Sequence, residues 1–127
     1  MPHLTLEYSA NLDGKMDVQE LCRAILKSAL ATGVFEVGAV RVRAVRCEHY
    51  AIADDEPDNG FIDVSLRLAA GRDLALRKTV GDAIFATMTE FLAPQFGTGH
   101  FALSFELREI DPKLSYKKNS IHDRLRT

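Results

Sequence analysis

The sequence predicts an α+β fold in which a duplicated βαβ plan forms a four-stranded mixed sheet with two helices on one face. Four segments alternate apolar and polar residues with the period of a half-buried strand. Two longer segments carry a single apolar stripe at helical spacing. The order strand, helix, strand occurs twice with similar lengths, and strands joined through a crossover helix normally pair in parallel.

Length and composition favour one globular domain. The 127 residues divide into βαβ halves at about 1–48 and 59–110 and a tail at 111–127. Apolar residues at 46% and charged residues at 27% are typical of soluble globular chains and argue against disorder or a membrane protein. The formal net charge of −2 provides no global field that attracts nucleic acid or anionic lipid, so neither is an expected partner.

The first half contains the clearest local signals. Residues 3–8 alternate as a strand. The following helix starts where Asp17 and Glu20 form a D-x-x-E capping pattern, and Gly33 is placed to end it. Residues 40–44 then alternate as a second strand with a polar, positively charged face.

The second half repeats this order after an acidic, turn-rich joint at 47–60. Residues 62–68 predict the third strand, Asp73 is a credible N-cap for the second helix, and residues 101–108 predict the fourth strand. Because both helices are expected on one face, the other face of the sheet is exposed unless other subunits cover it. The tail is too sparse in apolar residues for a core element and is expected on the surface or on a neighbouring subunit.

Pro2 is the first candidate for chemistry. Removing Met1 would turn it into a free secondary amine at the rim of the sheet, where it could act as a base. While Met1 remains attached, the Pro2 nitrogen is an amide without basicity. The alternative is that Pro2 only begins an edge strand, where its missing N–H costs nothing.

The arginines are the most informative polar residues, because a guanidinium binds a carboxylate with two parallel hydrogen bonds and stays charged. Arg41 and Arg43 lie on the second strand, and Arg72 follows Gly71 at a strand-to-helix turn. Alternation places Arg41 and Arg43 on the same side of the strand, so either could face a substrate while the other serves a subunit interface. The alternative for each is ordinary surface charge.

Neither a metal nor a cofactor is expected. Cys22 and Cys47 are the only cysteines, and they lack the spacing of a zinc site. The acidic joint lacks the glycine and terminal glutamate of an EF-hand loop. The first residues lack the features of a signal peptide, so a reducing cytoplasm is the expected location.

Nearly the whole chain resembles the tautomerase superfamily, and within it the 5-carboxymethyl-2-hydroxymuconate delta-isomerase family. The order and spacing of several short passages together carry the resemblance. These passages are residues 2–3, 31–35, 38–43, 70–74, 102–106 and 114–122.

The resemblance implies a tautomerase-like subunit of a homotrimer, whose sheets face inward around a threefold axis. It also implies a cofactor-independent isomerase that ketonises 5-carboxymethyl-2-hydroxymuconate, a small unsaturated carboxylate, in homoprotocatechuate degradation. The family roles that carry over are Pro2 as general acid and base, Arg72 as substrate-binding residue and Arg41 as a second anion contact, with Arg43 as a further candidate. Two alternatives stay open: a related enzyme acting on another 2-oxo acid such as phenylpyruvate, and a non-catalytic trimeric binding module.

Overall fold

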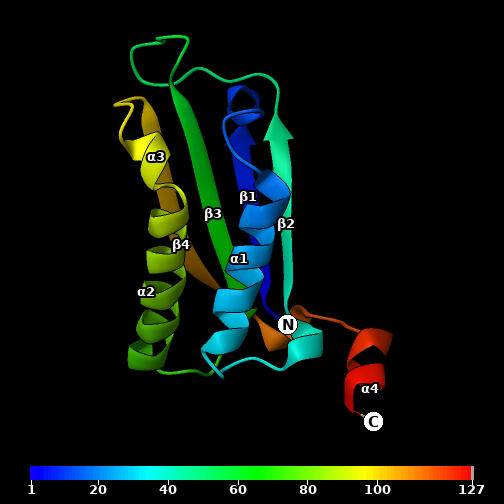
Figure 1. The fold of residues 1–127 in the computed structure, drawn as a ribbon. Coiled ribbons are helices and arrows are strands. Elements are labelled where there is room, and N and C mark those ends of the chain that lie inside the picture. The colour runs from blue at the N-terminus through cyan, green and yellow to red at the C-terminus, as the bar shows by residue number, and fades with distance from the viewer. Residues whose placement is uncertain (127) are drawn as a thin grey trace.

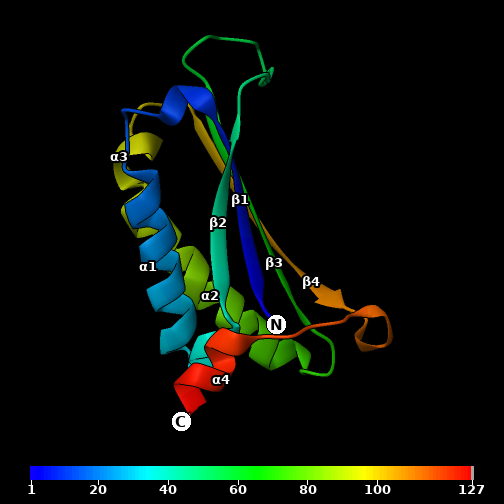
Figure 2. The same cartoon turned by 90° about the vertical axis from the view of Figure 1, so that its right-hand side faces the viewer.

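The computed structural model describes residues 1–126 and contains one four-stranded sheet in the order β2-β1-β3-β4 (Figure 1). Helices α1 and α2 lie side by side over one face of the sheet, as Figures 1 and 2 both show. The described elements are, in chain order, β1 (His3–Ser9), the 3-10 helix η1 (Ala10–Leu12), α1 (Val18–Ala31), η2 (Val37–Ala39), β2 (Arg41–Cys47), β3 (Gly60–Ala69), α2 (Leu74–Phe91), α3 (Ala93–Phe96), β4 (Phe101–Ile110), η3 (Pro112–Leu114) and α4 (Ser120–Arg126).

The strand pairing confirms the duplicated βαβ plan. β1 pairs with β2 in parallel, and β3 pairs with β4 in parallel. The two central strands, β1 and β3, run antiparallel to each other. The sheet is therefore mixed, as the sequence predicts, and each half of the chain supplies one parallel strand pair with its crossover helix.

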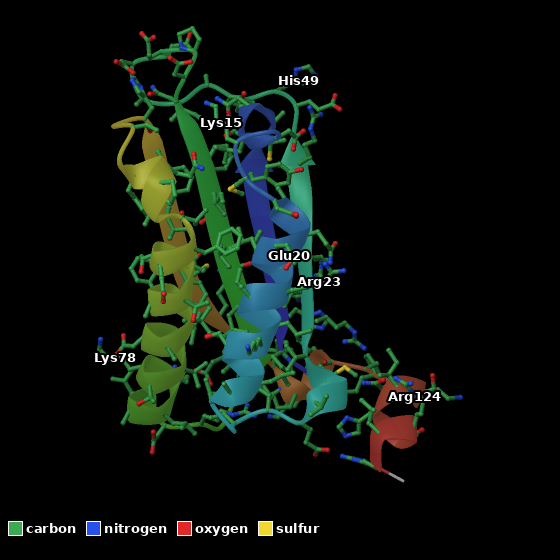
Figure 3. All side chains as sticks on the ribbon, in the orientation of Figure 1. Lys15, Glu20, Arg23, His49, Lys78 and Arg124 are labelled. Atoms are coloured by element: carbon green, nitrogen blue, oxygen red, sulfur yellow. The ribbon has the colours of Figure 1, made fainter. Side chains whose placement is uncertain are left out.

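The core lies between the sheet and the two long helices. Leu4 of β1 and Leu66 of β3 are fully buried, as are Ile25 of α1 and Ile84 of α2. Fully burying one such aliphatic side chain contributes about 1.5–3 kcal/mol, so this layer supplies the main stabilising free energy of the fold. Charged side chains of the two helices are exposed, among them Glu20 and Arg23 of α1 and Lys78 of α2, which Figure 3 labels.

Both long helices begin at the predicted caps. The Asp17 side chain accepts a hydrogen bond from the Glu20 backbone N–H at 3.0 Å, and the Asp73 side chain accepts one from the Leu76 N–H at 2.8 Å. These bonds satisfy backbone donors that have no partner within the helix. The short helix α3 follows the end of α2 and holds Pro94 in its first turn, where a missing N–H is tolerated.

The opposite face of the sheet carries no helix within the described residues (Figure 2). Basic and acidic side chains lie toward opposite ends of this open face. The register places His3 between Arg41 and Arg67, whereas Glu7, further along β1, pairs with Asp63. One end of the open face is therefore basic, and acidic side chains lie toward its other end.

The tail crosses the end of the sheet where the chain begins, and both views place it beside the N-terminus (Figures 1 and 2). It ends in α4, which packs against η2 of the same chain. No local pattern in the sequence predicts this contact. Thr127, the last residue of the predicted tail, lies outside the described residues. No helix in the described part of the chain is both long and apolar enough to cross a membrane.

Candidate active site

A cavity of about 430 Å³ lies at the end of the sheet where the chain begins, a size suited to a small-molecule ligand. Two of the predicted site residues, Pro2 and Arg72, both line it. The other described residues that line it are Met1, Val34, Phe35, Glu36, Ala39, Ala69, Lys117, Asn119, His122, Asp123 and Arg126.

The start of β1 fixes Pro2 in this cavity. The residue is buried, and its carbonyl accepts a hydrogen bond from the Arg41 backbone N–H at 3.2 Å. This bond ties Pro2 to the neighbouring strand through its carbonyl oxygen. Its nitrogen takes no part in the strand pairing, because a proline within a chain has no N–H to donate.

The surroundings of the chain start disfavour a positive charge on the terminal amine. Burial lowers the pKa of the Met1 amino group, and the positive charges of Lys117, Arg72 and Arg41 lower this pKa further, together with a hydrogen bond to Lys117. Both effects penalise the ammonium form of an amine. An amine at this place is therefore neutral at a lower pH than a free chain end.

Arg72 is held by two contacts at the wall of the cavity. Its guanidinium carbon lies 5.3 Å from the centroid of the Phe35 ring, and its Nη1 donates a hydrogen bond to the Ala69 carbonyl at 3.3 Å. A cation stacked on an aromatic face loses little freedom when it binds a ligand. The arrangement fixes a planar donor group at the cavity wall, where it suits a carboxylate.

Arg41 and Arg43 are not among the described residues that line the cavity. Arg41 Nη1 lies 2.9 Å from the Met1 sulfur, so this side chain reaches the residue that precedes Pro2. Arg43 Nη1 lies 3.3 Å from His3 Nδ1 on the open face of the sheet. The structure thus brings Pro2 and Arg72 together, places Arg41 next to Met1, and places Arg43 further along the sheet.

The tail supplies a wall of the cavity that sequence reasoning missed. Asn119 Nδ2 donates a hydrogen bond to the Gly38 carbonyl at 2.7 Å. His122 Nε2 lies 2.9 Å from a Glu36 carboxylate oxygen, and Arg126 donates to both oxygens of that carboxylate at 3.1 and 2.9 Å. The hydrogen bond from Arg126 is the main reason why the pKa of Glu36 is lowered. These contacts attach α4 to η2 and place Lys117 in the cavity.

The cavity is suited to an anionic ligand and to proton transfer by an amine. Within residues 1–126, no three His, Cys, Asp or Glu side chains gather in a way that could hold a metal ion. A neutral amine close to fixed cations can exchange protons with a carbon or oxygen acid whose negative charge the cations stabilise.

The sheet with its two crossover helices is a tautomerase fold. One solved structure with this fold, described as a fused 4-OT wild-type symmetric trimer, has a TM-score of 0.63 and 16% identity, and the match covers 91% of this chain and 93% of that one. A sequence profile of the 5-carboxymethyl-2-hydroxymuconate isomerase family matches residues 2–125, and the chain belongs to this family.

Individual relatives agree with the family assignment. The chain is 30% identical over 122 residues to the 5-carboxymethyl-2-hydroxymuconate Delta-isomerase of Escherichia coli, which covers 96% of this chain and 97% of that protein. It is 40% identical to a 5-carboxymethyl-2-hydroxymuconate isomerase from Deinococcus radiodurans R1, whose crystal structure matches with a TM-score of 0.92 over 99% of this chain and 95% of that one. The protein is therefore an enzyme, an isomerase.

Proposed function

We propose that this isomerase ketonises 5-carboxymethyl-2-hydroxymuconate without a cofactor, with Pro2 as general acid and base. The observation that carries the proposal is that Pro2 and Arg72 line the same cavity. Burial and nearby cations lower the pKa of the adjacent Met1 amino group, and the same surroundings should disfavour an ammonium at Pro2. The names of the relatives from Escherichia coli and Deinococcus radiodurans R1 supply the substrate.

In the proposed reaction, the Pro2 amine, freed of Met1, removes the proton of the enol hydroxyl group. The dienolate that forms takes a proton from the resulting ammonium at a distal carbon of the diene, so that substrate and product have the same atoms. The base must be neutral near pH 7, whereas a free chain end has a pKa of about 8. Burial and neighbouring cations supply this change, and a well-placed acid–base group accelerates proton transfer roughly 10²–10⁴-fold.

In this proposal the arginines bind the substrate carboxylates and stabilise the negative charge that develops on the dienolate. Arg72 binds a substrate carboxylate through its planar guanidinium, and the charge that develops on the dienolate is stabilised by the same cation. Arg41 is the second anion contact, because removal of Met1 frees it from the methionine sulfur, 2.9 Å from its Nη1. Arg43 is assigned to the open face, where it contacts His3.

We further propose that residues 1–127 act as one tautomerase-like domain and assemble as a homotrimer that covers the open face. The basic end of that face, with His3, Arg41 and Arg67, and its acidic side chains Glu7 and Asp63 favour pairing with another copy through opposite charges. The trimeric fused 4-OT structure shares the fold. A cytoplasmic location stays a prediction from the sequence.

An ultraviolet assay on Met-free protein tests the function. Intact mass first establishes that Met1 is absent, and turnover is then compared on 5-carboxymethyl-2-hydroxymuconate and phenylpyruvate. We expect the muconate to be the faster substrate, and Pro2→Ala, which keeps a terminal amine, to lose activity partly. Absence of muconate turnover, or a Pro2→Ala enzyme as fast as the parent, would overturn the proposal.

A further inference from the structure

We propose that Lys117 is a further substrate-binding residue of this enzyme, and that the C-terminal tail serves to hold it in the active site. In this arrangement Lys117 binds one carboxylate of the substrate while Arg72 binds another. The inference rests on the proposed function, because it assigns a role in the same cavity. It starts from the position of Lys117 in the cavity wall together with Pro2 and Arg72.

Asn119, two residues after Lys117, attaches this part of the tail through two hydrogen bonds. Asn119 donates from Nδ2 to the Gly38 carbonyl at 2.7 Å, and its Oδ1 accepts a hydrogen bond from the His122 N–H at 3.1 Å. One side chain therefore attaches the tail to η2 and caps the start of α4. This attachment holds the tail at the edge of the cavity, and Lys117, although exposed, lines the cavity two residues before Asn119.

The balance of charges in the cavity leaves Lys117 available to a ligand. The Glu36 carboxylate forms an ion pair with Arg126 and also contacts the His122 ring. Within the described residues, neither Lys117 nor Arg72 forms an ion pair with a carboxylate. The second carboxylate of the lining, Asp123, interacts with Arg126. Lys117 and Arg72 are therefore the lining cations without a carboxylate partner in an ion pair, and they can bind two carboxylates of one substrate molecule.

Lys117 also links substrate binding to the state of the base. In the protein that carries Met1, the charge of Lys117 adds to the effect of burial, and both lower the pKa of the Met1 amino group. The Pro2 amine, one residue along and in the same cavity, is expected to feel the same charge once Met1 is removed. A substrate carboxylate bound to Lys117 offsets that charge, so the amine becomes a stronger base once substrate is bound. The acidic limb of the pH profile should consequently lie at different pH values for kcat/KM, which reports the free enzyme, and for kcat, which reports the complex.

The test compares Lys117→Met with Lys118→Met in Met-free protein. Lys118 is exposed, as Lys117 is, but it is not among the described residues that line the cavity, so it is the matched control. We expect Lys117→Met to lose roughly ten- to a hundredfold in kcat/KM, mainly through KM, as for the loss of one charged hydrogen bond. Its acidic limb of kcat/KM should move to higher pH. Lys118→Met should match the parent, and Lys117→Arg should recover part of the loss.

Calorimetric binding of cis,cis-muconate separates this inference from the proposed reaction, since that dicarboxylate lacks the enol hydroxyl group and cannot turn over. Lys117→Met should bind it at least tenfold more weakly than Lys118→Met, with equal thermal unfolding of the two variants. Equal muconate affinity, or an active parent whose KM and acidic limb are unchanged in Lys117→Met, overturns the inference. A parent that binds muconate through Lys117 but shows no turnover counts against the proposed function alone.

Discussion

Gly38 lies directly beneath His122, so closely that a Cβ atom at position 38 would be 2.6 Å from the His122 Cα. This is a contact between backbones, and no rotation of a flexible side chain can relieve it. Glycine is therefore required at position 38 wherever α4 packs on η2. The wall of the active site depends on that small residue, which lies in a different part of the sequence from the tail.

Substituting Gly38 by alanine should detach the tail and weaken catalysis without unfolding the protein. The added methyl group forces α4 away, and Lys117 leaves the cavity with it. We expect at least a tenfold loss in kcat/KM, faster hydrogen exchange in residues 115–126, and a nearly unchanged melting temperature, because the tail contributes little to the core. Gly97→Ala is the control, since its Cβ would meet the nearest atom at an ordinary 3.5 Å. Unchanged exchange in the tail of Gly38→Ala would contradict the role of this contact.

Activity should follow the fraction of molecules that have lost Met1. An attached Met1 makes the Pro2 nitrogen an amide, and its side chain occupies part of the cavity beside Arg41. Across preparations expressed with different levels of methionine aminopeptidase, specific activity should rise in proportion to the Met-free fraction measured by intact mass. Full activity in protein that is entirely Met-retaining would exclude Pro2 as the base.

Arg72→Lys should be far more damaging than Arg43→Lys. Lysine keeps the charge at position 72 but loses the planar guanidinium and its stacking on Phe35. We expect a loss of about 1.5–3 kcal/mol of transition-state stabilisation, or roughly ten- to a hundredfold in kcat/KM. Arg43→Lys should leave kcat/KM of the assembled enzyme within about twofold. If the open face is an interface, Arg43→Lys should change the oligomeric state, which light scattering measures. Equal kinetic losses in the two variants would show that Arg72 has no special place in the cavity.

The end of the sheet far from the cavity depends on Asn11. Its Oδ1 accepts a hydrogen bond from the Ser9 hydroxyl at 2.7 Å, and its Nδ2 donates to the carbonyls of Asn59 at 2.7 Å and Pro57 at 3.3 Å. Asn11→Ala leaves these partners unsatisfied and should lower the free energy of unfolding in urea by about 1–3 kcal/mol. Turnover per folded molecule should not change. Asp58→Ala, at an exposed position in the same loop, should stay within about 0.5 kcal/mol of the parent.

Asp13 should make stability depend on acid pH. The hydrogen bond from Arg46 is the main cause that lowers the pKa of Asp13 below its ordinary value of 3.8. A carboxyl group whose pKa is lowered by folding stabilises the protein above the unfolded pKa, and this contribution is lost as pH falls through the folded pKa. The melting temperature of the parent should therefore fall below pH 4 more steeply than that of Asp13→Asn. Parallel curves for the two proteins would mean that the pair adds nothing to stability.

Local features of the sequence predicted the fold well because they depend on neighbouring residues. The caps at Asp17 and Asp73 bond to N–H groups three residues away, so their patterns are visible in a short window. Alternation likewise placed Arg41 and Arg43 on one side. It could not show that only Arg41 reaches Met1, because this depends on the register between β1 and β2.

The role of Lys117 could not be predicted from periodicity or composition. Its place depends on contacts between Asn119 and Gly38, which are 81 residues apart, and on the ion pair of Glu36 with Arg126 across 90 residues. The tail itself has no apolar stripe, so nothing in its own sequence indicates which surface it covers. Only the resemblance over residues 114–122 drew attention to this segment.

The tail forms part of the cavity that contains Pro2, and this affects when Met1 can be removed during synthesis. Pro2 leaves the ribosome long before the segment that encloses it, so an aminopeptidase meets an open chain start on the nascent polypeptide. In the folded protein Met1 is partly buried and lines the cavity. Methionine removal is therefore easiest before translation ends. With Pro2 as the proposed base, rapid expression that outpaces the aminopeptidase is expected to yield correctly folded but inactive molecules.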